Sequence, residues 1–363
     1  MTAAALHVVP GGSETQALIQ RSSASLRSEA HKGEGSPEML YEYLTPLRPF
    51  LIRDDLNEVC VNRPGEIWTE GANGWERHVD KRLTLAYCLQ LAQLIASFNN
   101  KAVSKDKASL SAQLIYGERV QVAVPPFSEP GTVAMTIRKP SVVDKTLDEL
   151  EAEGAFEELA VVDNELRPFE IELLQLKKEK KIKEFLELAM KSHRTLVVAG
   201  KTGSGKTTIS KSITNCIPQH ERLITVEDVH EMFLNKHPNK VHLFYSRDDE
   251  GGAKVSPKQA IATCLRKKPD RILLAEMRGD EAWEFVKAVG SGHPGVSTMH
   301  AGGAFESFDQ MVALIKDSPT GAHLDAAYIK QRVFATVDIV LFYERRKLRE
   351  IYYDPEFKRT QLA

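Results

Sequence analysis

The sequence contains no run of about 18 apolar residues, the length that a membrane-spanning helix requires. Its first nine residues also lack the basic flank and the long apolar segment of a secretory signal peptide. These two absences argue against helical membrane spans and against export by a signal peptide. We therefore expect a soluble protein that stays in the cytoplasm.

The sequence also has few cysteines and a small net charge. The chain has four cysteines, and no two of them are spaced as C-x-x-C. This pattern disfavours a zinc ribbon or a disulfide framework and is typical of reduced cytoplasmic thiols. The formal net charge is only −2, and no basic stripe with interleaved aromatic residues is present. Sequence-specific binding of nucleic acid is therefore not expected.

The length of 363 residues predicts two domains. Residues 1–36 are rich in Ser, Gly, Glu and Ala and predict a disordered tail. Residues 37–140 predict a small α+β domain, and the acidic segment 141–165 predicts a linker. The elements expected before the linker are a short helix over 41–47, a helix over 85–98 and strands over 57–62, 66–70, 112–116, 120–124 and 133–137.

Residues 166–363 alternate short apolar strands with helical segments, which predicts an α/β domain with a mostly parallel sheet between helices. The expected strands cover 195–199, 223–226, 241–244, 271–275, 296–299 and 337–342. Before them, residues 169–191 predict one amphipathic helix. Its basic face consists of Lys177, Lys178, Lys180, Lys181 and Lys183. That face is either a solvated surface or a contact with an anionic membrane or a partner protein.

The clearest motif is Gly-Lys-Thr-Gly-Ser-Gly-Lys-Thr at residues 200–207, directly after the apolar strand 196–199. It matches the P-loop pattern, in which backbone N–H groups surround a phosphate at the start of a helix. Lys206 would supply positive charge to the phosphates, and Thr207 would supply a hydroxyl to Mg²⁺. We expect ATP to contact Gly200, Lys201, Thr202, Gly203, Ser204, Gly205, Lys206, Thr207 and Thr208.

Two further strands end in carboxylates, Glu227 and Glu276. Ligands of parallel α/β sheets bind at the carboxyl ends of strands, so both side chains are expected beside the phosphates. One could hold Mg²⁺, and the other could orient or deprotonate a water. Each could instead cap the following helix. His300 ends a third strand after a Gly-rich segment, where it could donate to a terminal phosphate or have a structural role.

These segments resemble four boxes of the secretion-superfamily ATPases. The P-loop resembles Walker A, Glu227-Asp228 the Asp box, the Glu276 strand Walker B, and the segment 292–300 the His box. The likeness covers residues 40–345 and is closest to the traffic ATPases of type IV secretion and conjugation systems. It implies a RecA-like ATPase domain that follows a smaller, nucleotide-covering domain in the chain. Alternatives are a pilus assembly, pilus retraction or type II secretion motor and, from another class, a nucleic-acid translocase or helicase.

The resemblance also implies residue roles and partners. Arg119 and Arg138 resemble arginines that reach the nucleotide from the N-terminal domain, and Arg266 and Arg278 resemble arginines near the phosphates. Lys206, Glu227, Glu276, Arg278 and His300 would then form the catalytic set, with Thr207, Glu227 and Glu276 at the metal. The family further implies a homohexamer peripheral to the inner membrane. Its partners would be channel proteins and coupling ATPases.

Overall fold

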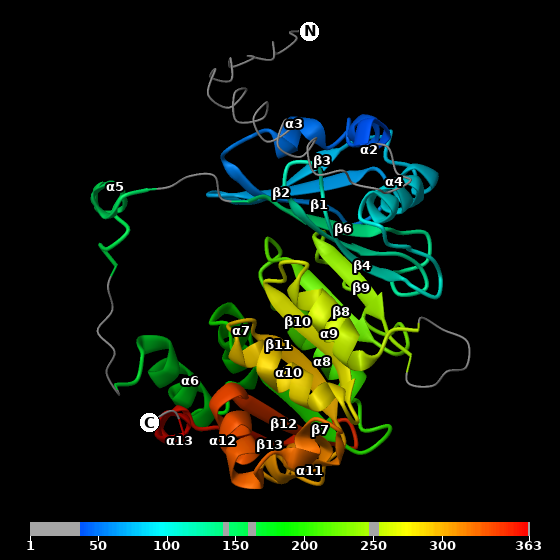
Figure 1. The fold of residues 1–363 in the computed structure, drawn as a ribbon. Coiled ribbons are helices and arrows are strands. Elements are labelled where there is room, and N and C mark those ends of the chain that lie inside the picture. The colour runs from blue at the N-terminus through cyan, green and yellow to red at the C-terminus, as the bar shows by residue number, and fades with distance from the viewer. Residues whose placement is uncertain (1–36, 141–144, 159–164, 247–253, 362–363) are drawn as a thin grey trace, which may run out of the picture.

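The structure is a computed structural model that describes residues 37–140, 145–158, 165–246 and 254–361 (Figure 1). The predicted disordered tail, 1–36, lies outside these residues, as do parts of the predicted linker. Within the linker the structure shows one short helix, α5 (Leu147–Ala152). Among the described helices, none is both long and apolar enough to cross a membrane.

The N-terminal domain is one antiparallel sheet in the order β3-β2-β1-β6-β5-β4. Three helices cover the face that is turned away from the second domain (Figure 1). The elements are α2 (Pro37–Tyr43), α3 (Arg48–Leu51), β1 (Leu56–Val61), β2 (Glu66–Gly71), β3 (Gly74–Val79), α4 (Leu85–Phe98), β4 (Ser109–Gln113), β5 (Arg119–Ala123) and β6 (Ala134–Arg138). The α+β prediction is confirmed. β3 was missed because its six residues are mostly exposed and therefore lack an apolar pattern.

The second domain has a seven-stranded sheet in the order β13-β12-β7-β11-β10-β8-β9, parallel except for β13. Its strands are β7 (Leu196–Gly200), β8 (Leu223–Glu227), β9 (Lys240–Phe244), β10 (Arg271–Met277), β11 (Gly295–Met299), β12 (Ile339–Glu344) and β13 (Lys347–Tyr353). The larger helices are α6 (Pro168–Lys178), α7 (Ile182–Lys191), α8 (Lys206–Thr214), α9 (Pro257–Leu265), α10 (Glu281–Gly290), α11 (Glu306–Asp317) and α12 (Ala326–Thr336). The α/β prediction is therefore confirmed.

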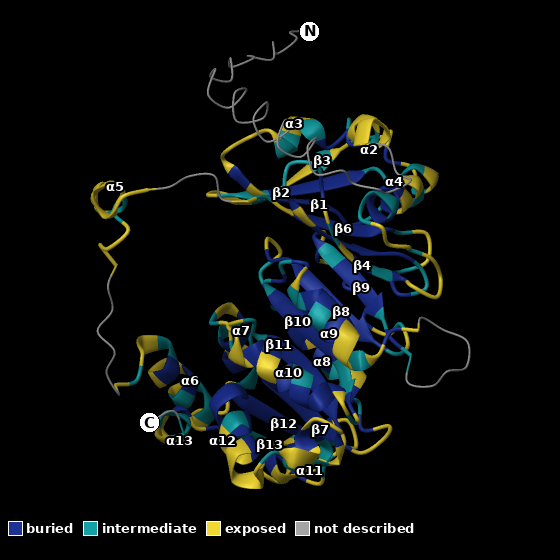
Figure 2. Ribbon diagram, viewed as in Figure 1, coloured by how far each residue is buried: buried dark blue, intermediate teal, exposed yellow. Residues whose placement is uncertain are grey.

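The side chains of β7 show why helices cover both faces of this sheet. Leu196 and Val198 pack in one apolar cluster with α6, α7 and α8, whereas Val197 and Ala199 pack in another with α9 to α12. Successive side chains of a strand point to opposite faces, so an unbroken apolar strand needs cover on both sides. The strands are accordingly buried between partly exposed helices (Figure 2).

The prediction of a single amphipathic helix over 169–191 is wrong. The structure has two helices, α6 and α7, and the break between them is at Lys180. Lys180 has a φ of 57°, a left-handed conformation that an α-helix does not continue through. The predicted basic face is therefore interrupted. Several of its lysines also have partners: Lys177 Nζ donates to Tyr353 O at 3.0 Å, and Lys181 and Lys183 form ion pairs with Glu179 and Glu187.

The two domains meet at the strand β9 and at the amino ends of β8 and β10, around the fully buried Arg222. Its guanidinium donates to Asn62 Oδ1 at 2.7 Å, to Asn239 Oδ1 at 2.5 Å and to Lys267 O at 2.9 Å. Asp270 accepts hydrogen bonds from the Arg222 backbone at 2.6 Å and from Trp75 Nε1 at 3.1 Å. A buried arginine needs such a set of acceptors, so this contact fixes one orientation of the domains.

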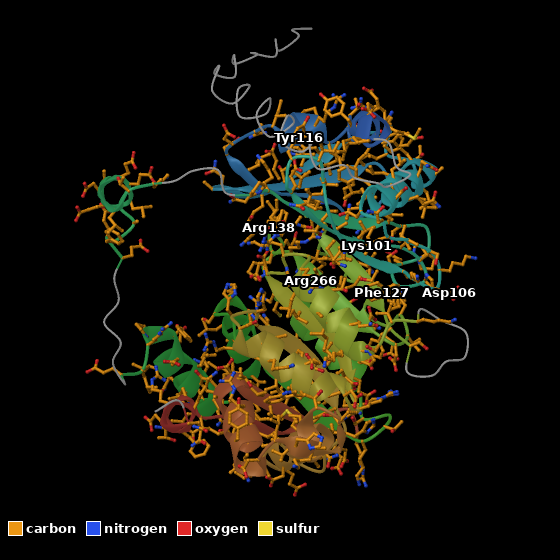
Figure 3. All side chains as sticks on the ribbon, in the orientation of Figure 1. Lys101, Asp106, Tyr116, Phe127, Arg138 and Arg266 are labelled. Atoms are coloured by element: carbon orange, nitrogen blue, oxygen red, sulfur yellow. The ribbon has the colours of Figure 1, made fainter. Side chains whose placement is uncertain are left out.

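Lys267 is the second buried cation of the junction. Its Nζ donates to two carbonyl oxygens of the N-terminal domain, Gln121 O at 3.1 Å and Ala134 O at 2.8 Å. Around these polar contacts, one apolar cluster runs from the N-terminal domain into the second domain. Lys101 and Phe127 of the first domain and Arg266 of the second lie at this junction (Figure 3). The junction is therefore packed in both its polar and its apolar parts.

Burial lowers the pKa of Lys267 to about 7. Between pH 7 and 10 the unfolded chain then binds more protons at this site than the folded chain, so stability rises with pH. We expect the free energy of unfolding of the wild type, minus that of Lys267→Met, to rise by about 1.4 kcal/mol per pH unit across this range. Urea unfolding at several pH values measures the difference. Lys268→Met, at the adjacent lysine, is the control, and a flat Lys267 difference would contradict the prediction.

Candidate active site

The P-loop lies between β7 and α8, as the sequence predicts. Gly203 and Gly205 have φ values of 73° and 101°, which side chains with a Cβ rarely adopt. A Cβ at Gly200 would collide with the carbonyl oxygen of Tyr343 on β12. These glycines let the loop turn tightly, so that the start of α8 presents its free N–H groups to one point.

The side chains of the loop are arranged as a phosphate site requires. Lys206 Nζ donates to Gly200 O at 2.7 Å and Lys201 O at 3.1 Å, so the ammonium is held inside the loop. Burial lowers the pKa of Lys206, and Glu276 acts in the opposite direction. Ser204 Oγ is buried and has no hydrogen-bond partner among the described residues. An anion in the loop would give Ser204 a partner and the Lys206 ammonium a further acceptor, so the residues fit a bound phosphate.

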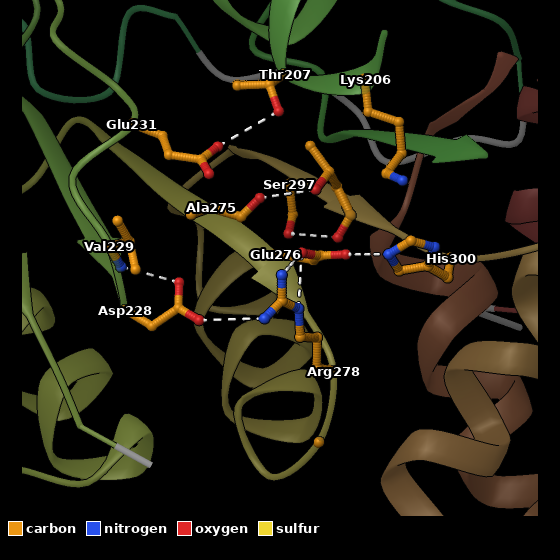
Figure 4. A network of polar contacts seen from close by, with 12 residues as sticks. Lys206, Thr207, Asp228, Val229, Glu231, Ala275, Glu276, Arg278, Ser297 and His300 are labelled. Atoms are coloured by element: carbon orange, nitrogen blue, oxygen red, sulfur yellow. Dashed lines mark hydrogen bonds and ion pairs between the residues drawn. The ribbon is translucent and has the colours of Figure 1, made fainter. Parts of the chain in front are cut away.

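Glu276, at the end of β10, is the centre of a charged network (Figure 4). Arg278 Nε donates to Glu276 Oε2 at 2.7 Å, and His300 Nε2 lies 2.7 Å from Glu276 Oε1. Arg278 also reaches Asp228 Oδ2 at 3.4 Å. The network brings the ends of β8, β10 and β11 together. Of the predicted residues, Arg278 and His300 therefore both contact Glu276.

Glu227 does not lie where the sequence predicts. Its side chain is fully buried, and Oε2 accepts the backbone N–H groups of Glu231 and Met232, both at 2.8 Å. Oε1 accepts from Thr225 Oγ1 at 2.5 Å and lies 3.4 Å from His242 Nδ1. These hydrogen bonds outweigh the opposing effect of burial and lower the pKa of Glu227. With its oxygens occupied, Glu227 holds the segment after β8 and is not available to Mg²⁺.

Glu231, unlike Glu227, lies next to Thr207, the residue whose hydroxyl is expected to bind Mg²⁺. Thr207 Oγ1 lies 3.4 Å from Glu231 Oε2, and both side chains are exposed (Figure 4). Thr207 and Glu231 are therefore the residues that could hold a magnesium ion here. Sequence reasoning missed Glu231 because it follows the strand by four positions. Glu281, which accepts the backbone N–H of Arg278 at 2.5 Å, was missed because it looks like an ordinary first-turn helix residue.

The structure does not bring the other predicted arginines to the P-loop of the same chain. Arg119 and Arg138 lie directly opposite each other on β5 and β6 of the N-terminal domain. This domain packs at the β9 side of the second domain, away from β7 (Figure 1). Arg138 Nε donates to Glu58 Oε1 at 2.6 Å. Arg266 is at the domain junction, where it donates to Ser111 Oγ at 3.2 Å. The cause is the junction, which holds the N-terminal domain against β9 instead of over the nucleotide edge.

Comparisons with known proteins identify the family of this chain. The family "Type II/IV secretion system protein" matches residues 153–336. The type IV secretion system protein VirB11 of Brucella suis is 40% identical over 328 residues, which is 88% of this chain and 91% of that protein. The chain belongs to the VirB11 family. PtlH, a type IV secretion system protein of Bordetella pertussis, is 39% identical over 314 residues, 84% of this chain and 90% of PtlH.

A solved VirB11 structure extends the comparison to the fold. The VirB11 ATPase from the Brucella suis type IV secretion system, in complex with sulphate, has a TM-score of 0.82 and 39% identity. The match covers 88% of this chain and 99% of that one. Membership of the VirB11 family, together with the P-loop, makes this chain a type IV secretion ATPase. The predicted family, fold class and ATPase activity are confirmed.

One pair of variants can distinguish the roles of Glu227, at the end of β8, and Glu231, in the segment that follows. We expect Glu227→Gln to lower the free energy of unfolding by about 2 kcal/mol, because an amide cannot accept all the hydrogen bonds made by the buried carboxylate. Glu231→Gln should change it by less than about 0.5 kcal/mol, because the side chain is exposed. Urea unfolding measures both. Normal stability with lost turnover in Glu227→Gln would instead make that residue catalytic.

Proposed function

We propose that this chain hydrolyses ATP at the carboxyl edge of β7, β10 and β11, and that Glu276 acts on the attacking water. The observation that carries the proposal is the contact of Glu276 with both Arg278 and His300, next to the P-loop lysine. A carboxylate held on both sides has a fixed direction, as a group that orients or deprotonates water needs. The neighbouring cations would stabilise the phosphate charge that develops during transfer.

The remaining residues would bind and position the triphosphate. The loop 200–207 and Thr208 would surround the phosphates with backbone N–H groups, while Lys206 turns its ammonium from the loop carbonyls to the anion. Thr207 and Glu231 would hold Mg²⁺, which neutralises phosphate charge when it is bound. Glu227 would keep Glu231 in place through the segment 228–232. His300, at the end of β11, would detect whether the terminal phosphate is bound, and its contact with Glu276 would pass this on to the carboxylate.

We further propose a homohexamer in which Arg119 and Arg138 act on the nucleotide of a neighbouring subunit. Like charges directly opposite each other in a sheet are destabilising, and Glu58 reaches only one of the two arginines. An anion brought by another subunit would compensate both. Because the P-loop of the same chain lies on the far side of the junction, a neighbour is the available source of that anion.

The proposed setting is the cytoplasmic side of the inner membrane, at a secretion or conjugation channel. The secretion proteins among the relatives support a channel as partner. The interrupted lysine surface of α6 and α7, with acidic partners at Lys181 and Lys183, favours docking through channel proteins or coupling ATPases over docking on lipid. Sequence-specific nucleic acid binding is not part of the proposal.

The role of Glu276 is tested by Glu276→Gln. We expect turnover to fall by about 100-fold or more, because the amide cannot accept the proton of the water. ATP binding should remain within about threefold, because the amide keeps the shape of the side chain and the P-loop is unchanged. Phosphate release and binding of a fluorescent ATP analogue measure the two effects. Glu356→Gln, at an exposed position of the C-terminal helix α13 (Pro355–Thr360), is the control. A parallel loss of binding and turnover would make Glu276 structural.

The contribution of a neighbouring subunit is tested by mixing two inactive variants. Lys206→Gln lacks the P-loop lysine, and Arg138→Gln lacks the arginine of the N-terminal domain. If the site is shared, mixed rings contain sites with an intact P-loop next to an intact Arg138, and ATPase activity should exceed the sum of the separate variants. Lys206→Gln mixed with Glu276→Gln is the control, because both residues belong to the same chain's site.

Absence of recovery with Arg138→Gln would contradict sharing between subunits. Since that change leaves the buried Glu58 without its partner, Arg119→Gln is mixed in the same way. Circular dichroism of each variant before mixing verifies the fold. Recovery with either arginine variant supports the shared site, and failure with both, in folded proteins that form mixed rings, overturns it.

A further inference from the structure

Three metal-binding side chains meet at the domain junction, outside the nucleotide site. They are Glu129, in the loop between β5 and β6 of the N-terminal domain, His230, in the segment after β8, and His242, on β9. One donor atom from each lies within 4.8 Å of the other two. Glu129 and His230 are partly exposed, and His242 is buried.

The loop that carries Glu129 is fixed against the second domain. Phe244 N donates to Phe127 O at 2.8 Å, and Ser128 forms a bridge with Leu243 on the edge strand β9. Within the loop, Ser128 Oγ donates to Thr132 O at 3.0 Å and Thr132 N donates to Glu129 O at 3.0 Å. Backbone hydrogen bonds therefore bring the carboxylate to the two imidazoles, so the cluster is already formed in the folded chain.

The hydrogen bonds behind His242 determine which ring nitrogen carries the proton. Thr225 Oγ1 donates its proton to the ionised Glu227, at 2.5 Å from Oε1. The same oxygen lies 2.8 Å from His242 Nδ1, so it can only accept there, and Nδ1 must be the donor. In the neutral ring, Nε2 then carries a lone pair. A histidine oriented in this way, through a hydroxyl to a carboxylate, is what metal sites use behind their ligands.

His230 supplies the second imidazole. Its ring centroid lies 4.7 Å from that of His242, and Phe233 and Phe244 flank it at 4.5 Å and 5.1 Å. His230 Nε2 is buried and has no hydrogen-bond partner among the described residues. A buried polar atom without a partner is uncommon and indicates that a water or an ion belongs next to it. The aromatic rings leave the histidine few other directions in which to find one.

We propose that Glu129, His230 and His242 bind a zinc-class divalent ion that links the N-terminal domain to the ATPase domain. Two imidazoles and one carboxylate are a frequent donor set for Zn²⁺, and the ion keeps a fourth position for water. Hard cations such as Mg²⁺ and Ca²⁺ prefer oxygen ligands only, so this set selects against the ion of the nucleotide site. The competing interpretation is a hydrogen bond between Glu129 and a histidine N–H, with no ion.

The position of this site connects it to the nucleotide edge without being part of it. His242 contacts Thr225, which contacts Glu227, and Glu227 holds the backbone of Glu231 and Met232. Asp228 and Glu231, on either side of His230, belong to the nucleotide edge. An ion on Glu129, His230 and His242 would therefore fix the segment after β8 at the same time as it fixes the N-terminal domain.

The test titrates Zn²⁺ into the full-length, untagged chain after treatment with a chelator. A chromophoric chelator competes for the ion, and excess Mg²⁺ without nucleotide occupies the oxygen-only positions. We expect the wild type to bind one Zn²⁺ per chain that the variant His230→Gln/His242→Gln does not bind. Glu129→Gln should raise the Kd at least about tenfold, a loss that even an outer partner of a metal ligand can cause. His220→Gln, at an exposed histidine outside the cluster, should bind as the wild type does.

Two further readouts decide between the interpretations. Zn²⁺ should raise the Tm of the wild type and not that of Glu129→Gln, because an ion that binds only the folded form stabilises it. Co²⁺ in place of Zn²⁺ should give the visible absorption of a tetrahedral site without a thiolate charge-transfer band. Equal Zn²⁺ binding by the wild type and the double variant, or a thiolate band from the half-buried Cys216, overturns the site. An unchanged Kd in Glu129→Gln overturns the link between domains.

Discussion

The buried cations of the domain junction determine how the rest of the molecule is arranged. Arg222 and Lys267 can be buried only because asparagine oxygens and backbone carbonyls accept their protons, and several of these acceptors belong to the N-terminal domain. Removing the N-terminal domain from this position would take both carbonyl acceptors from Lys267 and the Asn62 acceptor from Arg222. The domain is therefore held against β9 and the amino ends of β8 and β10, and the opposite edge of the sheet is left open for nucleotide.

The strand β8 joins the two ends of the domain. Its residues begin after Arg222, at the junction, and end with Glu227, which fixes the segment next to the P-loop. The parallel strands β7 to β12 make this possible, because their amino ends lie at one edge of the sheet and their carboxyl ends lie at the other. A change in the position of the N-terminal domain can thus reach the nucleotide edge through one short strand and the loop that follows it.

Polar groups at the nucleotide edge fall into two kinds. Glu227 is buried, accepts three hydrogen bonds and lies 3.4 Å from His242 Nδ1, so it can only maintain the backbone around it. Lys206, Ser204 and Glu276 have contacts that an arriving anion or water would replace or complete. The same chemical group, a glutamate at the carboxyl end of a strand, therefore has a structural role on β8, whereas on β10 we propose a chemical role for it. The difference is the space left beside each carboxylate.

The sequence alone was sufficient for the P-loop motif, the α/β alternation and the α+β character of the first domain, and it singled out Glu276, Arg278 and His300, which the structure brings together at the ends of β10 and β11. These depend on short motifs and on the apolar pattern of buried strands, which are local properties of the chain. Strands β3 and β13 and the break at Lys180 were missed, because exposed edge strands and a left-handed residue carry no apolar period. The role of Glu227, the importance of Glu231 and the distance of Arg119 and Arg138 from the P-loop were decided by tertiary structure. The role of Glu227 depends on how the segment after β8 turns back to the carboxylate. The positions of Glu231, Arg119 and Arg138 depend on contacts between segments far apart in the chain. A linear pattern contains neither kind of distance.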